Sequence, residues 1–145
     1  MQEQLVLYET AKLAKEKGFD WKVSLHYESN GNRFIDKVEC NFNNVELICS
    51  APTQSLLQKW LREVHNIHIE VLPRYQPKKL NTEEVLYSWA ISCKPFDKYD
   101  GHNDVLNHWI GIHNGAPYIE DIFYHVVKTY EEALEIGLYQ ALLLL

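Results

Sequence analysis

Residues 51–73, APTQSLLQKWLREVHNIHIEVLP, decide the fold class because an amphipathic helix runs directly into a strand. Pro52 and Thr53 are typical of a helix start, and Asn66 is typical of a helix end. After Asn66 the apolar residues alternate, which predicts a strand that ends at Pro73. The helix is predicted from an apolar stripe whose members are Leu56, Leu57, Trp60, Leu61 and Val64.

Two more helices are predicted, one near each end of the sequence. The first covers residues 2–17 and is closed by Gly18; its apolar side comprises Val6, Leu7, Ala11, Leu13 and Ala14. The last begins at Thr129, where the sequence TYEE has the form of a capping box. Its apolar stripe comprises Tyr130, Ala133, Leu134, Gly137, Leu138 and Ala141. Because the sequence finishes with four leucines, we expect this tail to enter the core or to contact a second copy.

The remaining predicted elements are strands. Residues 21–27 alternate between apolar and polar, and Asn30-Gly31 predicts a hairpin turn with positive φ at both positions. The return strand is predicted at 33–40, a third strand at 45–49 and a fifth at 85–93. Two further strands are predicted at 105–112 and 122–127.

These elements predict a single α+β domain over residues 1–145, with a mostly antiparallel sheet and three helices packed on one face. A chain of 145 residues is long enough to bury one substantial core. The helix within 51–73 connects the third strand to the fourth, so one parallel pair with a right-handed crossover is also expected.

The charge and the cysteines narrow the class of protein. The net charge is −6, which disfavours nucleic-acid binding because such binding depends on neutralising phosphates. Cys40, Cys49 and Cys93 are widely spaced and form no CxxC pair, so they are interpreted as buried thiols in a reducing compartment. The first residues lack the pattern of a signal peptide, and no segment has ~18–20 continuous apolar residues. A cytoplasmic protein without a membrane span is expected.

Three blocks of the sequence carry a family resemblance: AKLAKEKGF near the start, WLREVHNIHIEV in the middle and YEEALEIGLYQAL near the end. Together they resemble small proteins of bacterial prophages and mobile elements, common in Bacteroidetes. The resemblance covers about half of the chain and not residues 74–121. It implies an accessory protein inside a bacterial cell, and it implies no reaction and no catalytic residues.

Histidines and acids suggest a metal site in one region. His102, His108 and His113 share that region with five acids, Asp97, Asp100, Asp104, Glu120 and Asp121. The spacing of His108 and His113 places them on opposite faces of a strand, so no metal or other cofactor is predicted. His65 and His68 flank the end of the central helix, and we expect the former to be a protonated cap favoured by the helix dipole.

Two functions from different classes follow. The first is a non-enzymatic accessory protein that acts by contact with an unknown protein partner and forms homo-oligomers. No nucleophile elbow or phosphate-binding loop is present in the sequence, which favours this interpretation. The alternative is a small nucleic-acid-binding modulator that uses a basic segment at 74–79, in which Arg74, Tyr75, Lys78 and Lys79 contact phosphates and stack on a base.

Overall fold

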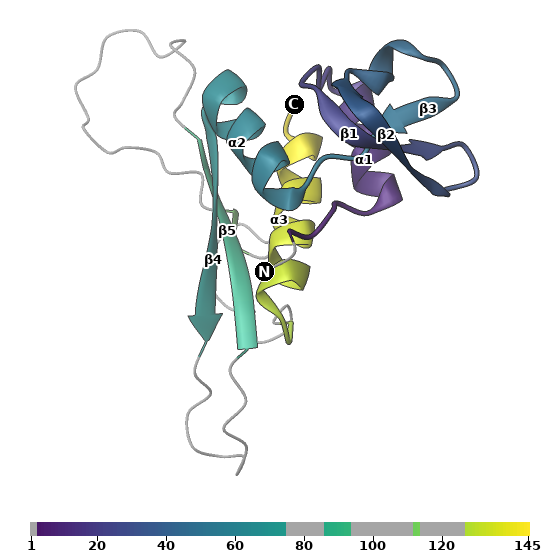
Figure 1. The fold of residues 1–145 in the computed structure, drawn as a ribbon. Helices are drawn as coiled ribbons and strands as arrows, with labels where there is room; N and C mark the ends of the chain where they lie inside the picture. Colours follow the sequence, from purple (N-terminus) through teal and green to yellow (C-terminus); the bar gives the residue numbers. More distant parts are fainter. Residues whose placement is uncertain (1–2, 75–85, 94–111, 114–126) are drawn as a thin grey trace, which may run out of the picture.

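The computed structural model describes residues 3–74, 86–93, 112–113 and 127–145. Within them are three α-helices, a short 3-10 helix and six strands, and the α+β class is confirmed (Figure 1). The helices are α1 (Tyr8–Glu16), α2 (Gln54–His65) and α3 (Tyr130–Leu143), and the 3-10 helix spans Phe42–Asn44. The strands are β1 (Val23–Glu28), β2 (Arg33–Cys40), β3 (Ile48–Ser50), β4 (Ile67–Arg74), β5 (Leu86–Cys93) and β6 (Ile112–His113).

The described elements form two three-stranded sheets, where the sequence predicted one. The first has the strand order β2-β1-β3 and the second has the order β4-β5-β6. All pairings within them are antiparallel. The expected parallel pair is therefore wrong, because the strands before and after α2 belong to different sheets.

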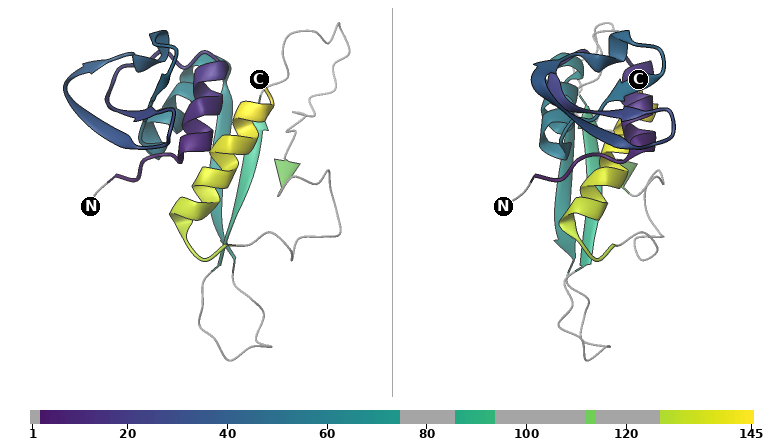
Figure 2. Two further views of the ribbon diagram at one scale, coloured as in Figure 1. Left: turned by 90° about the vertical axis from the view of Figure 1, so that its right-hand side faces the viewer. Right: turned by 45° about the vertical axis from the view of Figure 1, so that its right-hand side comes forward.

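The helices lie between the two sheets. Helices α2 and α3 pack on the second sheet, while α1 contacts both β3 and α3. Figure 2 shows the same order from two further sides, with α3 running beside α1. Among the helices that the structure describes, none combines the length and apolar character needed to cross a bilayer.

The predicted β1–β2 hairpin is present, but its turn differs from the expected one. Gly31 has a φ of +80°, whereas Asn30 is not among the positive-φ residues. The Gly31 amide donates to the Glu28 carbonyl at 2.8 Å and the Glu28 amide donates to the Asn32 carbonyl at 3.0 Å. This pattern is a three-residue loop closed by a left-handed glycine, so only the glycine needs a positive φ.

Strand β2 is irregular along its length. Leu25 pairs with Ile35, but Val23 pairs with Cys40, so β2 uses five residue steps where β1 uses two. The three extra residues form a bulge-like interruption of the strand pairing, and such interruptions are common on edge strands. Among the strands that the structure describes, β2 lies at the edge of its sheet, since it pairs with β1 alone.

Helix α1 begins at Tyr8 and not at residue 2 as predicted. The residues before it are extended and pair with the start of α2: the Val6 amide donates to the Pro52 carbonyl at 3.1 Å and the Gln54 amide donates to the Gln4 carbonyl at 2.8 Å. Pairing with a distant segment therefore overrides the helical pattern of this stretch. Leu7, predicted to be buried, is 62% exposed as a result.

The predicted ends of α2 are confirmed. Thr53 accepts a hydrogen bond from the Leu56 amide at 3.2 Å, and Asn66 closes the helix in the left-handed conformation with a φ of +55°. The strand that follows does not end at Pro73, because Pro73 pairs with Tyr87 and β4 continues to Arg74. An edge strand tolerates proline where its missing N–H would face away from the neighbour.

The core contains most of the predicted apolar stripes. Leu57, Trp60 and Leu61 of α2 are fully buried, and Trp60 contacts Phe19 edge-to-face at 5.4 Å between ring centroids. Val64 and Tyr130 were also predicted to be buried, but both are exposed. On α3 the stripe of Ala133, Leu134, Leu138 and Ala141 is buried as predicted.

The predicted strands at 105–112 and 122–127 fall mostly outside the described residues. Their described ends are the short strand β6, which pairs with β5, and Val127, which bridges to Tyr87.

Gly137 provides a test of the packing between α3 and the second sheet. A Cβ at this position would lie 2.8 Å from Ile69 Cγ2 and 3.4 Å from Trp89 Cβ. We expect Gly137→Ala to lower the free energy of unfolding by about 1–3 kcal/mol through overpacking, despite the better helix propensity of alanine. Urea denaturation measures this change. Gln140→Ala on the same helix is the control, and equal stability of the two variants would contradict this account of the interface.

Candidate functional site

The residues of the nucleic-acid hypothesis lie at the boundary of the described structure. The backbone of Arg74 ends strand β4, opposite Leu86. Tyr75, Lys78 and Lys79 lie outside the described residues. The basic segment at 74–79 therefore stays a prediction.

The residues weighed for a metal site also fall largely outside. His102 and His108 are not among the described residues, nor are Asp97, Asp100, Asp104, Glu120 and Asp121. His113 lies in β6, where its backbone pairs with Ala90. In the part of the chain that the structure describes, no three histidine, cysteine or acidic residues are grouped as metal ligands would be.

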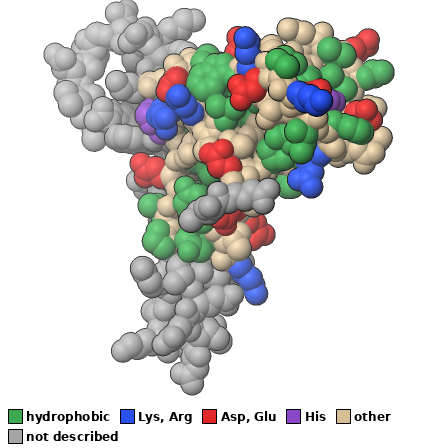
Figure 3. Space-filling model, viewed as in Figure 1, with side chains coloured by type: hydrophobic (Ala, Val, Ile, Leu, Met, Phe, Trp, Pro, Cys, Tyr) green, Lys and Arg blue, Asp and Glu red, His purple; other side chains and the backbone are tan. Residues whose placement is uncertain are grey.

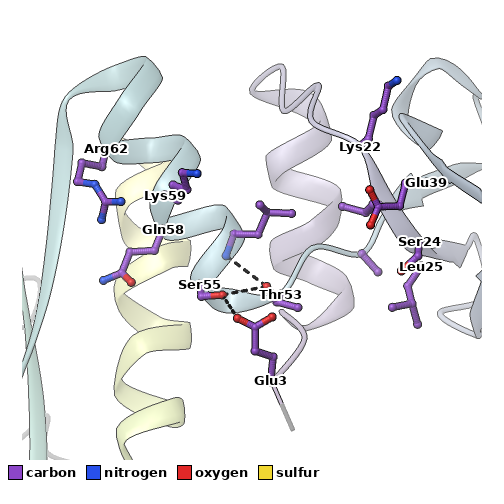
Figure 4. Close-up of a pocket in the computed structure, with 13 residues that line it drawn as sticks. Glu3, Lys22, Ser24, Leu25, Glu39, Thr53, Ser55, Gln58, Lys59 and Arg62 are labelled. Atoms are coloured by element: carbon purple, nitrogen blue, oxygen red, sulfur yellow. Dashed lines mark hydrogen bonds between the residues drawn. The ribbon is translucent and has the colours of Figure 1, made fainter. Parts of the chain in front are cut away.

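A polar groove of about 540 Å³ separates α2 from the first sheet (Figure 4). One wall is the first half of α2, and the other is formed by the start of β1 and the end of β2. The charged residues of its lining are Glu3, Lys22, Glu39, Lys59 and Arg62. The groove is an open, mixed-charge surface and not a pocket lined by one sign of charge.

Two hydroxyls of the groove, those of Thr53 and Ser55, are engaged at the start of α2. Ser55 Oγ lies 3.1 Å from Thr53 Oγ1 and donates to the Glu3 carboxylate. A carboxylate is favoured beside a helix N-terminus by the helix dipole. We therefore interpret Ser55 as part of the helix cap and not as a nucleophile.

The lysine in the groove has partners of its own. The Lys59 ammonium lies 5.7 Å from the centre of the Trp21 ring and 3.9 Å from Glu63. Both interactions are at the surface, where such pairs are worth about 0–1 kcal/mol. Lys59 thus already interacts with Trp21 and Glu63. These contacts make its ammonium less available to an anionic ligand in the groove.

The buried carboxylate of Glu135 on α3 accepts three hydrogen bonds in the described structure. Its Oε1 accepts from the Leu7 amide at 2.8 Å and from Thr10 Oγ1 at 2.6 Å. Its Oε2 accepts from Gln54 Nε2 at 2.8 Å, and the same amide nitrogen donates to the Glu131 carbonyl at 3.0 Å. Leu7 is the N-cap of α1 and Gln54 begins α2, so one carboxylate bonds to the starts of two other helices.

This cluster is best explained as a structural element. A buried charge is tolerated only where its hydrogen bonds are satisfied, and helix N-termini supply unpaired donors and a favourable dipole. Tyr27 lies nearby and donates to the Val6 carbonyl at 2.7 Å. Burial raises the pKa of Tyr27, and the charge of Glu135 adds to the increase. The phenol therefore stays protonated as a donor.

Sequence reasoning missed this cluster. Gln54, Thr10 and Glu135 were not selected because polar residues are expected on the wet face of a helix. The available signal was the position of Glu135 between Leu134 and Ile136 in a helix that is apolar on most sides.

A second cluster lies on the outer face of the first sheet. The His26 ring stacks on Phe34 at 5.7 Å and contacts Phe42 at 4.6 Å, centroid to centroid. His26 Nδ1 lies 2.8 Å from Asp36 Oδ2, although the two atoms lack the alignment of a full hydrogen bond. Because Phe34 and Asp36 belong to β2, the imidazole attaches that edge strand to β1.

His65 does not have the predicted role of a protonated cap. Its ring packs edge-to-face on Trp60 at 4.5 Å, and its Nε2 is buried without a hydrogen-bond partner among the described atoms. Burial lowers the pKa of His65, so the folded protein favours the neutral ring. His68 is exposed on β4.

The two cysteines whose side chains are described differ in environment, and the side chain of Cys93 lies outside the described part of the structure. Cys49 is buried as expected, and burial raises the pKa of its thiol, which keeps it protonated. Cys40 was expected to be buried but is exposed at the end of β2.

No family model, curated protein or solved structure matches the chain. The candidate sites therefore depend on the geometry described above.

The buried carboxylate can be tested by Glu135→Gln. The variant keeps the shape of the side chain but turns an amide nitrogen toward donors such as Gln54 Nε2, so a buried donor loses its acceptor. We expect the free energy of unfolding to fall by about 1–3 kcal/mol. Urea denaturation measures the loss, and Glu63→Gln at the surface should change stability by less than about 0.5 kcal/mol. Equal effects of the two substitutions would show that the cluster is not important for stability.

His65 predicts a dependence of stability on pH. In the unfolded chain the imidazole binds a proton as the pH falls through about 6.5, while in the folded protein it does so only at lower pH. The free energy of unfolding should therefore decrease as the pH falls from neutral through this window. Urea midpoints for His65→Gln should decrease less than those of the parent protein. His68→Gln is the matched control and should keep the full decrease.

Proposed function

We propose that this protein is a non-enzymatic accessory protein that works by binding an extended segment of another protein along strand β2. The setting that we propose is a bacterial cell carrying a prophage or mobile element, following the resemblance of the sequence. The observation that supports the binding role most directly is the exposure of β2.

Strand β2 carries large apolar side chains in water. Ile35 is 81% exposed and Val38 is 71% exposed, and Phe34 is also exposed. Every residue of this strand is exposed or half-buried. Single exposed apolar residues are ordinary, but several on one edge strand are typical of a contact surface.

The main chain of β2 also offers hydrogen bonds. The Glu28 amide bonds to the Asn32 carbonyl, so this pair is of the hydrogen-bonded type. Because hydrogen-bonded and non-bonded pairs alternate in an antiparallel ladder, the amides and carbonyls of Arg33 and Ile35 point away from β1. An extended partner segment can bond to these groups as an added strand.

The contact surface is held in shape. His26 fixes Phe34 by stacking and approaches Asp36 within the bulge, so Ile35 lies between two residues attached to β1. A surface ordered before binding loses less conformational entropy when a partner binds.

Charges along β2 favour a selective contact. Arg33, Asp36, Lys37 and Glu39 are interspersed with the apolar residues. Charged residues and a bulge disfavour indiscriminate edge-to-edge pairing. They also select a partner whose own charges are complementary.

Site-specific photocrosslinking in the native bacterial host tests this proposal. A benzophenone amino acid replaces Ile35, and a matched protein carries it in place of Glu63 on α2. We expect a discrete heavier adduct from position 35 and none from position 63. Adding Val38→Glu to the position-35 protein should remove the adduct, because a charge then enters the apolar contact.

Circular dichroism of each variant checks that the fold is kept, which is expected since β2 contributes little to the core. Equal adducts from both positions, or none from position 35, would overturn the proposal. Mass spectrometry of the adduct then identifies the partner.

A further inference from the structure

Helix α3 carries a second apolar surface that is separate from β2. Its outward positions are Glu132, Ile136, Tyr139 and Leu143, spaced four, three and four residues apart. Ile136, Tyr139 and Leu143 are 36%, 37% and 51% exposed, while the residues between them are mostly buried. This spacing is that of the contact seam of a coiled coil. Figure 2 shows α3 in view along its length from one side of the molecule.

A hollow of about 570 Å³ adjoins this seam at the start of α3. Leu7, Gln54, Glu132, Glu135 and Ile136 are among the residues that line it. Leu7 is the most exposed apolar residue there, and it extends the apolar surface from α3 to the start of α1. Figure 3 shows green apolar side chains reaching the surface between red acidic ones on the described face of the molecule.

We infer that the seam of α3 binds the α3 of a second copy, antiparallel, about a two-fold axis near Tyr139. In this arrangement the two Tyr139 rings meet at the axis, and Ile136 of each copy faces the Leu143 region of the other. Leu144 and Leu145, both exposed, then reach the level of the hollow beside Leu7. The apolar residues of the seam are thereby self-complementary, as a two-fold contact requires.

The charges on α3 select the antiparallel orientation. Glu131 and Glu132 lie in the first turn, and the last turn carries no charged residue. A parallel pair would bring the acids of the two copies together. In the antiparallel pair the two Glu132 positions are about 20 Å apart along the axis, at about 1.5 Å of rise per residue. Their repulsion is then screened, since the Debye length is about 8 Å at physiological ionic strength.

The size of the surface predicts a weak dimer. The partly exposed apolar side chains of this surface offer roughly 400–500 Å² per copy, given that a whole aromatic side chain buries about 150–250 Å². These six residues are Leu7, Ile136, Tyr139, Leu143, Leu144 and Leu145. The total is close to the lower limit of about 1,000 Å² for a specific interface. We therefore expect a dissociation constant in the micromolar range and a population of dimers that depends on concentration.

Sedimentation velocity of the purified protein, from low to high micromolar concentration, tests the inference. We expect conversion from monomer to dimer, and we expect Tyr139→Glu to remain monomeric throughout because it places two charges at the axis. Ile35→Glu is the matched control and should dimerise as the parent does. Ile35→Glu removes the proposed partner contact, whereas Tyr139→Glu removes the proposed self-contact. A failure of the partner-binding proposal is therefore distinguishable from a failure of the dimer inference.

Cysteine crosslinking tests the orientation in a Cys40→Ser, Cys93→Ser background, which removes the exposed thiol of Cys40 and the thiol whose side chain lies outside the described residues. Tyr139→Cys should form a disulfide-linked dimer under mild oxidation, and Glu132→Cys should not. A monomer at every concentration would overturn the inference, as would a dimer lost with Ile35→Glu but kept with Tyr139→Glu. Crosslinking at position 132 in place of 139 would overturn the antiparallel arrangement.

Discussion

One buried carboxylate joins the three α-helices that the structure describes. Glu135 accepts hydrogen bonds from the start of α1 and from the first residue of α2, while it is itself carried by α3. Removing a charge from water is costly, and here the Leu7 amide and the side chains of Thr10 and Gln54 offset that cost. Since these donors belong to helices that contact different sheets, the carboxylate links the first sheet to the second. A hydrophobic core alone does not fix how the two sheets and their helices are oriented, because apolar attraction has no preferred direction.

Local sequence signals predicted the local structure well. The glycine of Asn30-Gly31, the left-handed Asn66 and the Thr53 and Thr129 caps each depend on the chemistry of a few neighbouring residues, and each is present. Predictions that depended on distant partners were less successful. The first residues have a helical pattern, yet the backbone at 52–54 binds them as an extended segment. The division into two sheets likewise depends on which strands pair, and periodicity carries no information about that choice.

The candidate sites likewise depend on contacts between distant residues, which local sequence patterns do not reveal. Glu135 is a good helix former in a helical sequence; its apolar neighbours suggested burial, but its partners, 81 and 128 positions away, could not be predicted from the sequence. His65 was assigned by the rule for helix ends, but contact with Trp60 and burial outweigh the helix dipole. The exposure of β2 was also unpredicted, because a strand of an antiparallel sheet is expected to bury one of its faces.

Two constraints on α3 explain why its apolar seam points outward. Glu135 has to face α1 and α2, and Gly137 has to face Ile69 and Trp89, where a side chain has no room. Successive helix residues differ by about 100° in direction, so these two positions together fix the rotation of the helix. Ile136, Tyr139 and Leu143 then cannot turn inward without breaking the carboxylate bonds or forcing bulkier residues against the second sheet. Their exposure is therefore imposed by the interior of the protein.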